Sequence, residues 1–142
     1  MRGVNLKDKI TVLVVDDSAF MRKVISDLLQ QDKRIEVIGT ARNGQDALDK
    51  IKINKPDVIT LDVEMPILDG LGTLKKIMEE SPVPVVMVSS TTLEGAENTV
   101  MAMEYGAVDF IAKTSGSISL DLHKIKDEII NKVRSEERRV GK

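Results

Sequence analysis

Short runs rich in valine and isoleucine alternate along this chain with segments in which apolar residues recur at helical spacing. This alternation predicts an α/β fold in which a parallel sheet carries helices on both faces. Continuous apolar content predicts that the first, third and fourth strands are buried on both faces, whereas the charge at Glu36 favours a place for the second strand nearer the edge. The predicted strands are residues 10–15, 35–41, 58–61, 85–88 and 108–112.

A helix is predicted after each strand, and local turn chemistry agrees with these boundaries. Asn43 precedes the second helix, with Asp46 placed where a capping acid would help. Gly106 is expected to end the fourth helix, because glycine tolerates the left-handed conformation. The apolar stripes of the first, second, third and last helices are Phe20, Val24, Leu28 and Leu29; Ala47, Leu48 and Ile51; Leu71, Leu74 and Ile77; and Leu122, Ile125, Ile129 and Val133.

The length of 142 residues and the apolar content of 42% suit one domain with a full hydrophobic core. We predict an N-terminal extension over 1–9, the domain over 10–134, and a charged segment over 135–142 that is a tail, a cut linker or an expression remnant. No apolar export segment or membrane-spanning stretch occurs, so a cytoplasmic protein without membrane insertion is expected.

Charge and cysteine content exclude several classes of function. The net charge of -2, from 23 acidic and 21 basic residues, provides no broad basic surface for nucleic acid or anionic lipid. The absence of cysteine excludes disulfides, thiolate catalysis and cysteine-based zinc sites.

Three aspartates directly follow two of the predicted strands: Asp16 and Asp17 follow the first, and Asp62 follows the third. The carboxyl ends of parallel strands meet where open α/β sheets bind their ligands, so the three carboxylates are expected to converge. Like charges 4 Å apart repel by roughly 4 kcal/mol per pair at an effective dielectric near 20. A divalent cation with oxygen ligands, such as Mg²⁺, would relieve this repulsion.

A hydroxyl and an ammonium group are predicted at the same edge, because Ser89 follows the fourth strand and Lys113 the fifth. Each residue also has an ordinary interpretation. Asp17 or Ser18 could cap the first helix, Ser89 could satisfy a loop, and Lys113 could be solvated. Asp62 could equally be a turn carboxylate. The placement of these groups at the ends of four different predicted strands favours a shared site.

Transfer of a phosphoryl group to a carboxylate is the chemistry that this set suits. An aspartate is ionised at neutral pH and needs no general base to act as a nucleophile. A Mg²⁺ ion at Asp17 and Asp62 would neutralise the charge that develops as two anions meet. Lys113 and Ser89 would then bind the remaining phosphoryl oxygens.

Four motifs in chain order resemble those of two-component receiver domains, over about Ile10 to Val133. They are Val-Val-Asp-Asp-Ser-Ala-Phe-Met-Arg at 14–22, Thr-Leu-Asp-Val-Glu-Met-Pro at 60–66 with Asp69-Gly70, Val88-Ser89, and Gly-Ala-Val-Asp-Phe-Ile-Ala-Lys at 106–113. The resemblance implies a five-stranded, flavodoxin-like (CheY-like) doubly wound sheet of order 2-1-3-4-5. Finer features around 61–66 and 84–90 resemble the receiver half of chemotaxis protein-glutamate methylesterases.

The resemblance also implies roles at the metal site. Asp62 would accept phosphate from a histidine kinase of the CheA type. Asp17, Asp62 and the main-chain carbonyl of Glu64 would bind Mg²⁺, with Asp16 acting through water.

Other implied roles concern the phosphorylated state. Ser89 and Lys113 would contact the phosphoryl group, and Phe110 occupies the place of the family's rotating aromatic switch. Many receivers have a cis proline after the lysine, but Thr114 follows Lys113 here. A cis bond before a non-proline residue costs about 2.5 to 4 kcal/mol, so the loop after Lys113 is expected to be trans or strained.

Such a receiver is expected to regulate a methylesterase/deamidase effector domain that this chain does not contain. The chain has no Gly-x-Ser-x-Gly motif, and its single histidine, His123, falls on the predicted last helix. The chain itself is therefore expected to be no enzyme beyond its phosphoacceptor chemistry. Glu97, Met101 and Tyr105, spaced four apart, form a candidate partner surface.

Three alternatives remain open at this stage. The chain could be a stand-alone chemotaxis receiver of the CheY type, or a scaffold that is never phosphorylated. It could also be a phosphatase of the haloacid dehalogenase type, for which Asp62-Val-Glu64 is an imperfect Asp-x-Asp motif.

Overall fold

The computed structural model describes residues 9–63, 65, 69–90, 100–113, 127 and 131 of the protein. For residues 89, 90 and 109–113 it describes the main chain only. The proposed limits of the extension and the tail lie at or beyond the ends of this range and stay predictions.

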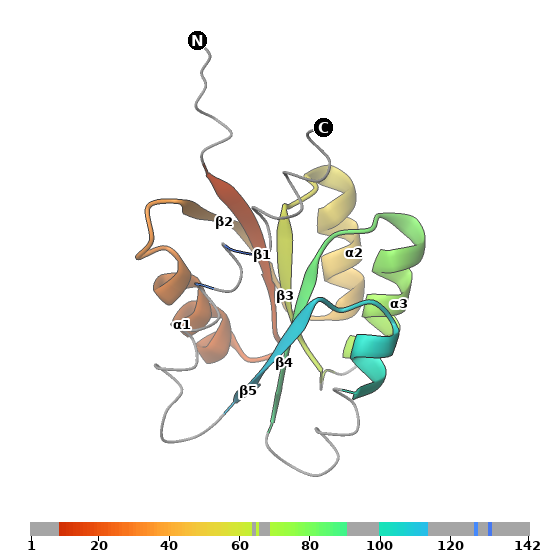
Figure 1. The fold of residues 1–142 in the computed structure, drawn as a ribbon. Coiled ribbons are helices and arrows are strands. Elements are labelled where there is room, and N and C mark those ends of the chain that lie inside the picture. The colour runs from red at the N-terminus through yellow and green to blue at the C-terminus, as the bar shows by residue number, and fades with distance from the viewer. Residues whose placement is uncertain are drawn as a thin grey trace.

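The strands of the structure are β1 (Ile10–Val15), β2 (Ile35–Ala41), β3 (Val58–Asp62), β4 (Val85–Ser90) and β5 (Asp109–Lys113). They run parallel in one sheet of order β2-β1-β3-β4-β5, which confirms the predicted α/β class and strand order. In Figure 1 the strands run downward, so their carboxyl ends meet at the lower edge of the sheet. Asp62 is the last residue of its strand and Lys113 the last of β5, one residue further than predicted in each case.

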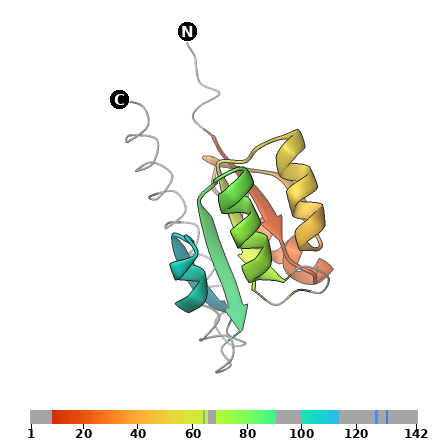
Figure 2. The ribbon, with the colours of Figure 1, turned by 90° about the vertical axis from the view of Figure 1, so that its right-hand side faces the viewer.

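Helices cover both faces of the sheet. Helix α1 (Ala19–Leu29) lies on one face, and α2 (Gly44–Ile53) and α3 (Gly70–Glu80) lie together on the other. The two views of the ribbon show this layering from the front and from the side of α2 and α3 (Figure 1, Figure 2). Residues 100–104 are also helical. In the described part of the chain, no helix combines the length and apolarity that a membrane crossing would require.

Alternate residues of the central strands supply two separate cores. Val12 and Val14 pack in the cluster on the α1 face, whereas Leu13 and Val15 pack in the cluster with α2 and α3. All four are buried, as the continuous apolar run predicted. Fully burying one such side chain stabilises the fold by about 1.5 to 3 kcal/mol.

Phe20 does not belong to the core, so the predicted stripe of α1 is wrong at its first member. The Phe20 side chain is 73% exposed, because it lies in the first turn of the helix on the solvent side. Ile25 and Leu29 are the buried residues of this helix, with Val24 and Leu28 packed partly against them.

Side-chain caps start α1, α2 and α3 just beyond the carboxyl edge. The Ser18 hydroxyl accepts a hydrogen bond from Met21 N at 3.2 Å, so Ser18, and not Asp17, caps α1. The Asn43 side chain caps α2 by accepting from Asp46 N, and the Asp69 side chain caps α3 by accepting from Gly72 N. Asp17 is therefore left for another role.

Gly106 ends the helical residues 100–104 in the predicted left-handed region, with φ of 114°. Of the candidate partner surface, Met101 is 41% exposed, whereas Tyr105 packs partly against the core. Glu97 lies outside the described residues, as do the last predicted helix and His123.

Candidate functional site

Three carboxylates meet at the carboxyl edge of the sheet. Asp16, Asp17 and Asp62 each offer one oxygen, and these oxygens all lie within 4.8 Å of one another. Asp16 is 0% and Asp62 1% exposed, whereas Asp17 is open to solvent. The sequence therefore predicted this convergence, and one exposed member leaves the group accessible from outside.

Asp16 is held by a set of local hydrogen bonds directly after β1. Its main-chain N–H donates to Ala41 O at 3.0 Å, and its Oδ1 accepts from Ser18 N at 2.9 Å. The Arg22 guanidinium donates to the Asp16 main-chain oxygen at 2.9 Å. These bonds fix the turn between β1 and α1, so Asp16 is oriented by the fold itself.

Asp62 lies in the middle of the sheet, at the end of a strand flanked by β1 and β4. It pairs in register with Val88, and Val63 N donates to Val88 O at 2.9 Å just beyond it. Gly70 N in turn donates to Val63 O at 2.9 Å. The carboxylate thus extends from a main chain that is tied to β4 on one side and to the start of α3 on the other.

The main chains of Ser89 and Lys113 reach the same edge. Ser89 follows Val88, the register partner of Asp62, and Lys113 pairs with Ser90 at the end of β5. Phe110, three residues before Lys113 in β5, pairs with Met87. The predicted roles of these three side chains stay predictions.

Two further sequence expectations fall outside the described residues. Glu64, the predicted carbonyl ligand, is one, and the peptide between Lys113 and Thr114 is the other.

The donors at this cluster suit a magnesium ion. All three are hard carboxylate oxygens, the ligand type that Mg²⁺ and Ca²⁺ prefer. Two of the three carboxylates are buried, where repulsion between like charges is less screened than in water. A divalent cation would offset that repulsion, so the residues present fit the group.

Sequence reasoning did not single out Arg22 or Gly70 as supports of the site. The Arg22 bond joins a side chain to a main-chain oxygen, and no residue pattern indicates it. Gly70 was noticed only as part of a motif, and its role depends on how closely α3 approaches β3.

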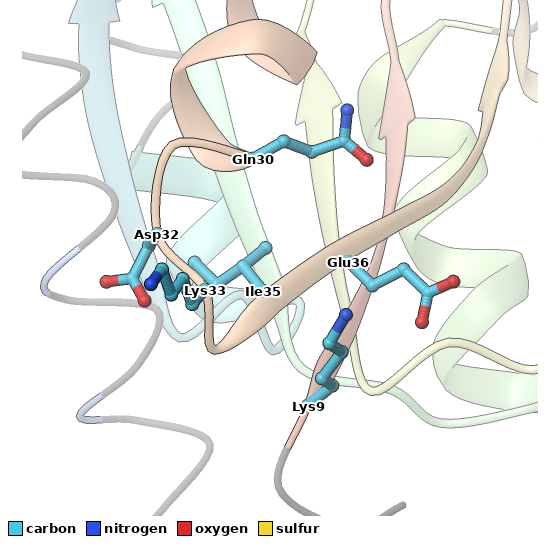
Figure 3. Close-up of a pocket in the computed structure, with 6 residues that line it drawn as sticks. All are labelled: Lys9, Gln30, Asp32, Lys33, Ile35 and Glu36. Carbon is cyan, nitrogen blue, oxygen red and sulfur yellow. The ribbon is translucent and has the colours of Figure 1, made fainter.

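An open hollow at the opposite edge of the sheet has a different character (Figure 3). Asp32 there accepts two guanidinium hydrogen bonds from Arg34, at 3.0 and 2.9 Å, and this pairing raises the pKa of Arg34. The hollow is lined by Lys9, Gln30, Asp32, Lys33, Ile35 and Glu36. Charges of both signs are interspersed, so this surface offers no concentrated site.

Comparison with known proteins agrees with the geometry. Residues 12–123 match the response regulator receiver domain family. The chain is 71% identical over 124 residues to a protein-glutamate methylesterase/protein-glutamine glutaminase of Geobacillus kaustophilus, covering 87% of this chain and 36% of that protein. The corresponding Bacillus subtilis protein is 64% identical over 124 residues, covering 87% of this chain and 35% of that protein.

Among solved structures, the response regulator domain of Thermotoga maritima CheB is 50% identical, with a TM-score of 0.76. The match covers 89% of this chain and 95% of that domain. The chain belongs to the response regulator receiver domain family. The predicted likeness to the receivers of chemotaxis methylesterases is confirmed, and the chain spans about a third of the length of those curated relatives.

Proposed function

We propose that this chain is the phosphoacceptor domain of a chemotaxis response regulator and that Asp62 is the residue phosphorylated. The observation that carries the proposal is the convergence of Asp16, Asp17 and Asp62 within 4.8 Å at the carboxyl edge of the sheet. The phosphodonor would be the phosphohistidine of a kinase of the CheA type, encountered in the cytoplasm.

Asp62 is the best placed nucleophile of the three acids. It lies centrally in the sheet, in register with Val88, the residue that precedes Ser89 in β4. Asp17 is exposed, so it suits a metal ligand that meets an incoming ion. Burial and position thus support nucleophilic attack by Asp62 and metal binding by Asp17.

In the proposed reaction, an Asp62 carboxylate oxygen attacks the phosphorus of the phosphohistidine. The new O–P bond forms while the P–N bond breaks, and the imidazole nitrogen leaves with the electron pair. A bound Mg²⁺ would neutralise phosphoryl oxygens, and Asp17, Asp62 and the Glu64 carbonyl would hold it, with Asp16 acting through water. Lys113 and Ser89 would bind the other phosphoryl oxygens.

The consequence of phosphorylation would be regulation of an effector domain. The curated relatives are named as methylesterases and glutaminases, and this chain matches about a third of their length. We propose that the chain is their regulatory portion and turns over no substrate itself. Ser89 and Phe110 would respond to the phosphate, which adds about 1.5 to 2 negative charges.

Intact mass after incubation with acetyl phosphate and Mg²⁺ tests the proposal. The wild-type chain should gain one phosphoryl group, and Asp62→Asn should gain none. Asp27→Asn is a matched control, because Asp27 forms an exposed pair with Lys23 on α1.

The same experiment separates the alternatives. Continuous release of inorganic phosphate without a stable adduct would favour a phosphatase of the haloacid dehalogenase type. An unmodified wild-type chain would favour a scaffold receiver. Phosphotransfer from a CheA-type kinase, followed by methylesterase assay of the full-length protein, would distinguish a methylesterase regulator from a stand-alone receiver.

A further inference from the structure

Gly70, the first residue of α3, is buried against the main chain that carries Asp62. A β-carbon at this position would overlap the Asp62 main-chain oxygen. It would also lie 2.6 Å from Val63 Cα and 2.8 Å from Val63 O. All three atoms belong to the backbone, so no side chain can turn away to make room.

The close approach is reinforced by a hydrogen bond and a fixed first helical turn. Gly70 N donates to Val63 O at 2.9 Å. Asp69 Oδ1 accepts from Gly72 N at 2.8 Å, and the Asp69 main-chain oxygen accepts from the buried Thr73 hydroxyl at 2.8 Å. The start of α3 is therefore a firm support on which the end of β3 rests.

We infer that Gly70 is a positioning residue for the phosphoacceptor site, and this inference rests on the proposed function. The absence of a side chain lets α3 press directly on the last residue of β3, which holds Asp62 in reach of Asp16 and Asp17. A methyl group at Gly70 would push the main chain of Asp62 and Val63 away from α3. The carboxylates would then no longer share one ion with the same geometry.

Two other glycines provide matched comparisons. A β-carbon at Gly39 would meet only Leu13 Cδ1, at an ordinary 3.7 Å. At Gly106 the positive φ of 114° makes any side chain strained, and the nearest atoms are Met78 Cγ and Sδ at 3.3 Å. Met78 lies about 12 Å further along α3 than Gly70, at a rise of 1.5 Å per residue. Gly106→Ala thus perturbs the fold away from the site.

The experiment compares Gly70→Ala, Gly39→Ala and Gly106→Ala in the whole chain. Each variant is measured for melting temperature, Mg²⁺ dissociation constant and phosphorylation rate with acetyl phosphate. Gly70→Ala should weaken Mg²⁺ binding about 10- to 100-fold, the range known for residues that orient metal ligands. Gly106→Ala should lower the melting temperature yet change Mg²⁺ affinity less than about twofold, and Gly39→Ala should leave both nearly unchanged.

A readout without metal completes the comparison. In the metal-free protein, the amide chemical shifts of Asp62 and Val63 should move in Gly70→Ala and stay in place in Gly106→Ala. If Gly70→Ala lowers stability but keeps wild-type Mg²⁺ affinity and wild-type shifts at Asp62, the inference is overturned.

Hydrogen exchange of the wild-type chain keeps the inference testable if Gly70→Ala does not fold. The Gly70 amide should be as protected in the metal-free protein as the Ile77 amide within α3, and rapid exchange at Gly70 would contradict the inference. A wild-type chain that accepts no phosphate would instead overturn the proposed function. The two failures are therefore distinguishable.

Discussion

At the amino edge of the sheet, the Asp32 side chain is only 10% exposed and accepts a bidentate pair of hydrogen bonds from the Arg34 guanidinium. At the carboxyl edge, Asp16 and Asp62 are more deeply buried and lie together with Asp17. At the amino edge, the covered acid Asp32 has a guanidinium beside it. At the carboxyl edge, three carboxylates come within 4.8 Å of one another.

This difference shows which edge is built for a ligand. A covered acid with its own arginine is electrically satisfied and adds to the structure, although a surface pair of this kind contributes little stability. Grouped acids oppose folding unless an added cation offsets their repulsion. The hollow at the amino edge is lined by side chains of both charges (Figure 3). The carboxyl edge instead gathers three acidic side chains that can bind one cation.

The largest expected effect is on metal affinity. Asp17→Asn should weaken Mg²⁺ binding by at least about tenfold, or about 1.4 kcal/mol, because a charged ligand is lost from the cluster. Asp32→Asn removes the same charge at the other edge and should leave the affinity within about twofold. Titration calorimetry of the two variants measures the Mg²⁺ affinity. Equal losses of affinity in both variants would contradict the difference between the edges.

A helix cap beside the site should affect stability and leave metal binding intact. Ser18→Ala removes the hydroxyl that accepts from Met21 N and should cost about 1 kcal/mol in unfolding free energy. Asn43→Ala, at the cap of α2, is the matched control and should cost a similar amount. Asp16 is held by the Ser18 main-chain N–H, which the substitution keeps.

Denaturant titration and Mg²⁺ titration of these two variants test that separation. A loss of Mg²⁺ affinity in Ser18→Ala as large as that in Asp17→Asn would show that the hydroxyl itself belongs to the site.

The smallest expected effect is the change in unfolding free energy when one acid at each edge is neutralised in the metal-free protein. Asp17→Asn should stabilise the chain by about 1 kcal/mol, because its solvent-exposed carboxylate lies within 4.8 Å of the buried Asp16 and Asp62 carboxylates and water screens part of the repulsion. Asp32→Asn should destabilise it, because Arg34 loses its partner. Urea unfolding in the presence of a chelator measures both, and a shared sign would contradict the contrast.

Much of the fold was predictable from two patterns, the apolar runs of the buried strands and the helical spacing of apolar residues between them. The β-branched runs gave the bounds of β1 and β2 to the residue, and parallel pairing then brought Asp16, Asp17 and Asp62 to one edge. Phe20 belongs to the predicted apolar stripe of α1 yet is exposed, because helical spacing alone does not tell which side of the first turn faces the sheet.

The supports of the site were not predictable in the same way. The closeness of Gly70 to Asp62 and Val63 arises only when α3 is packed onto β3, and no local pattern contains that distance. The Arg22 bond to the Asp16 main chain likewise depends on the turn between β1 and α1. Ligand types can be recognised in a sequence, whereas the backbone that orients them is a property of the folded chain.

Paramagnetic broadening by Mn²⁺ tests most directly whether the acids of the carboxyl edge share one divalent cation. Substoichiometric Mn²⁺ should broaden the amide resonances of Asp16, Asp17 and Asp62 and spare those of Asp32 and Glu36, and excess Mg²⁺ should reverse the effect. Broadening centred on the amino edge, or spread equally over both edges, would contradict the account.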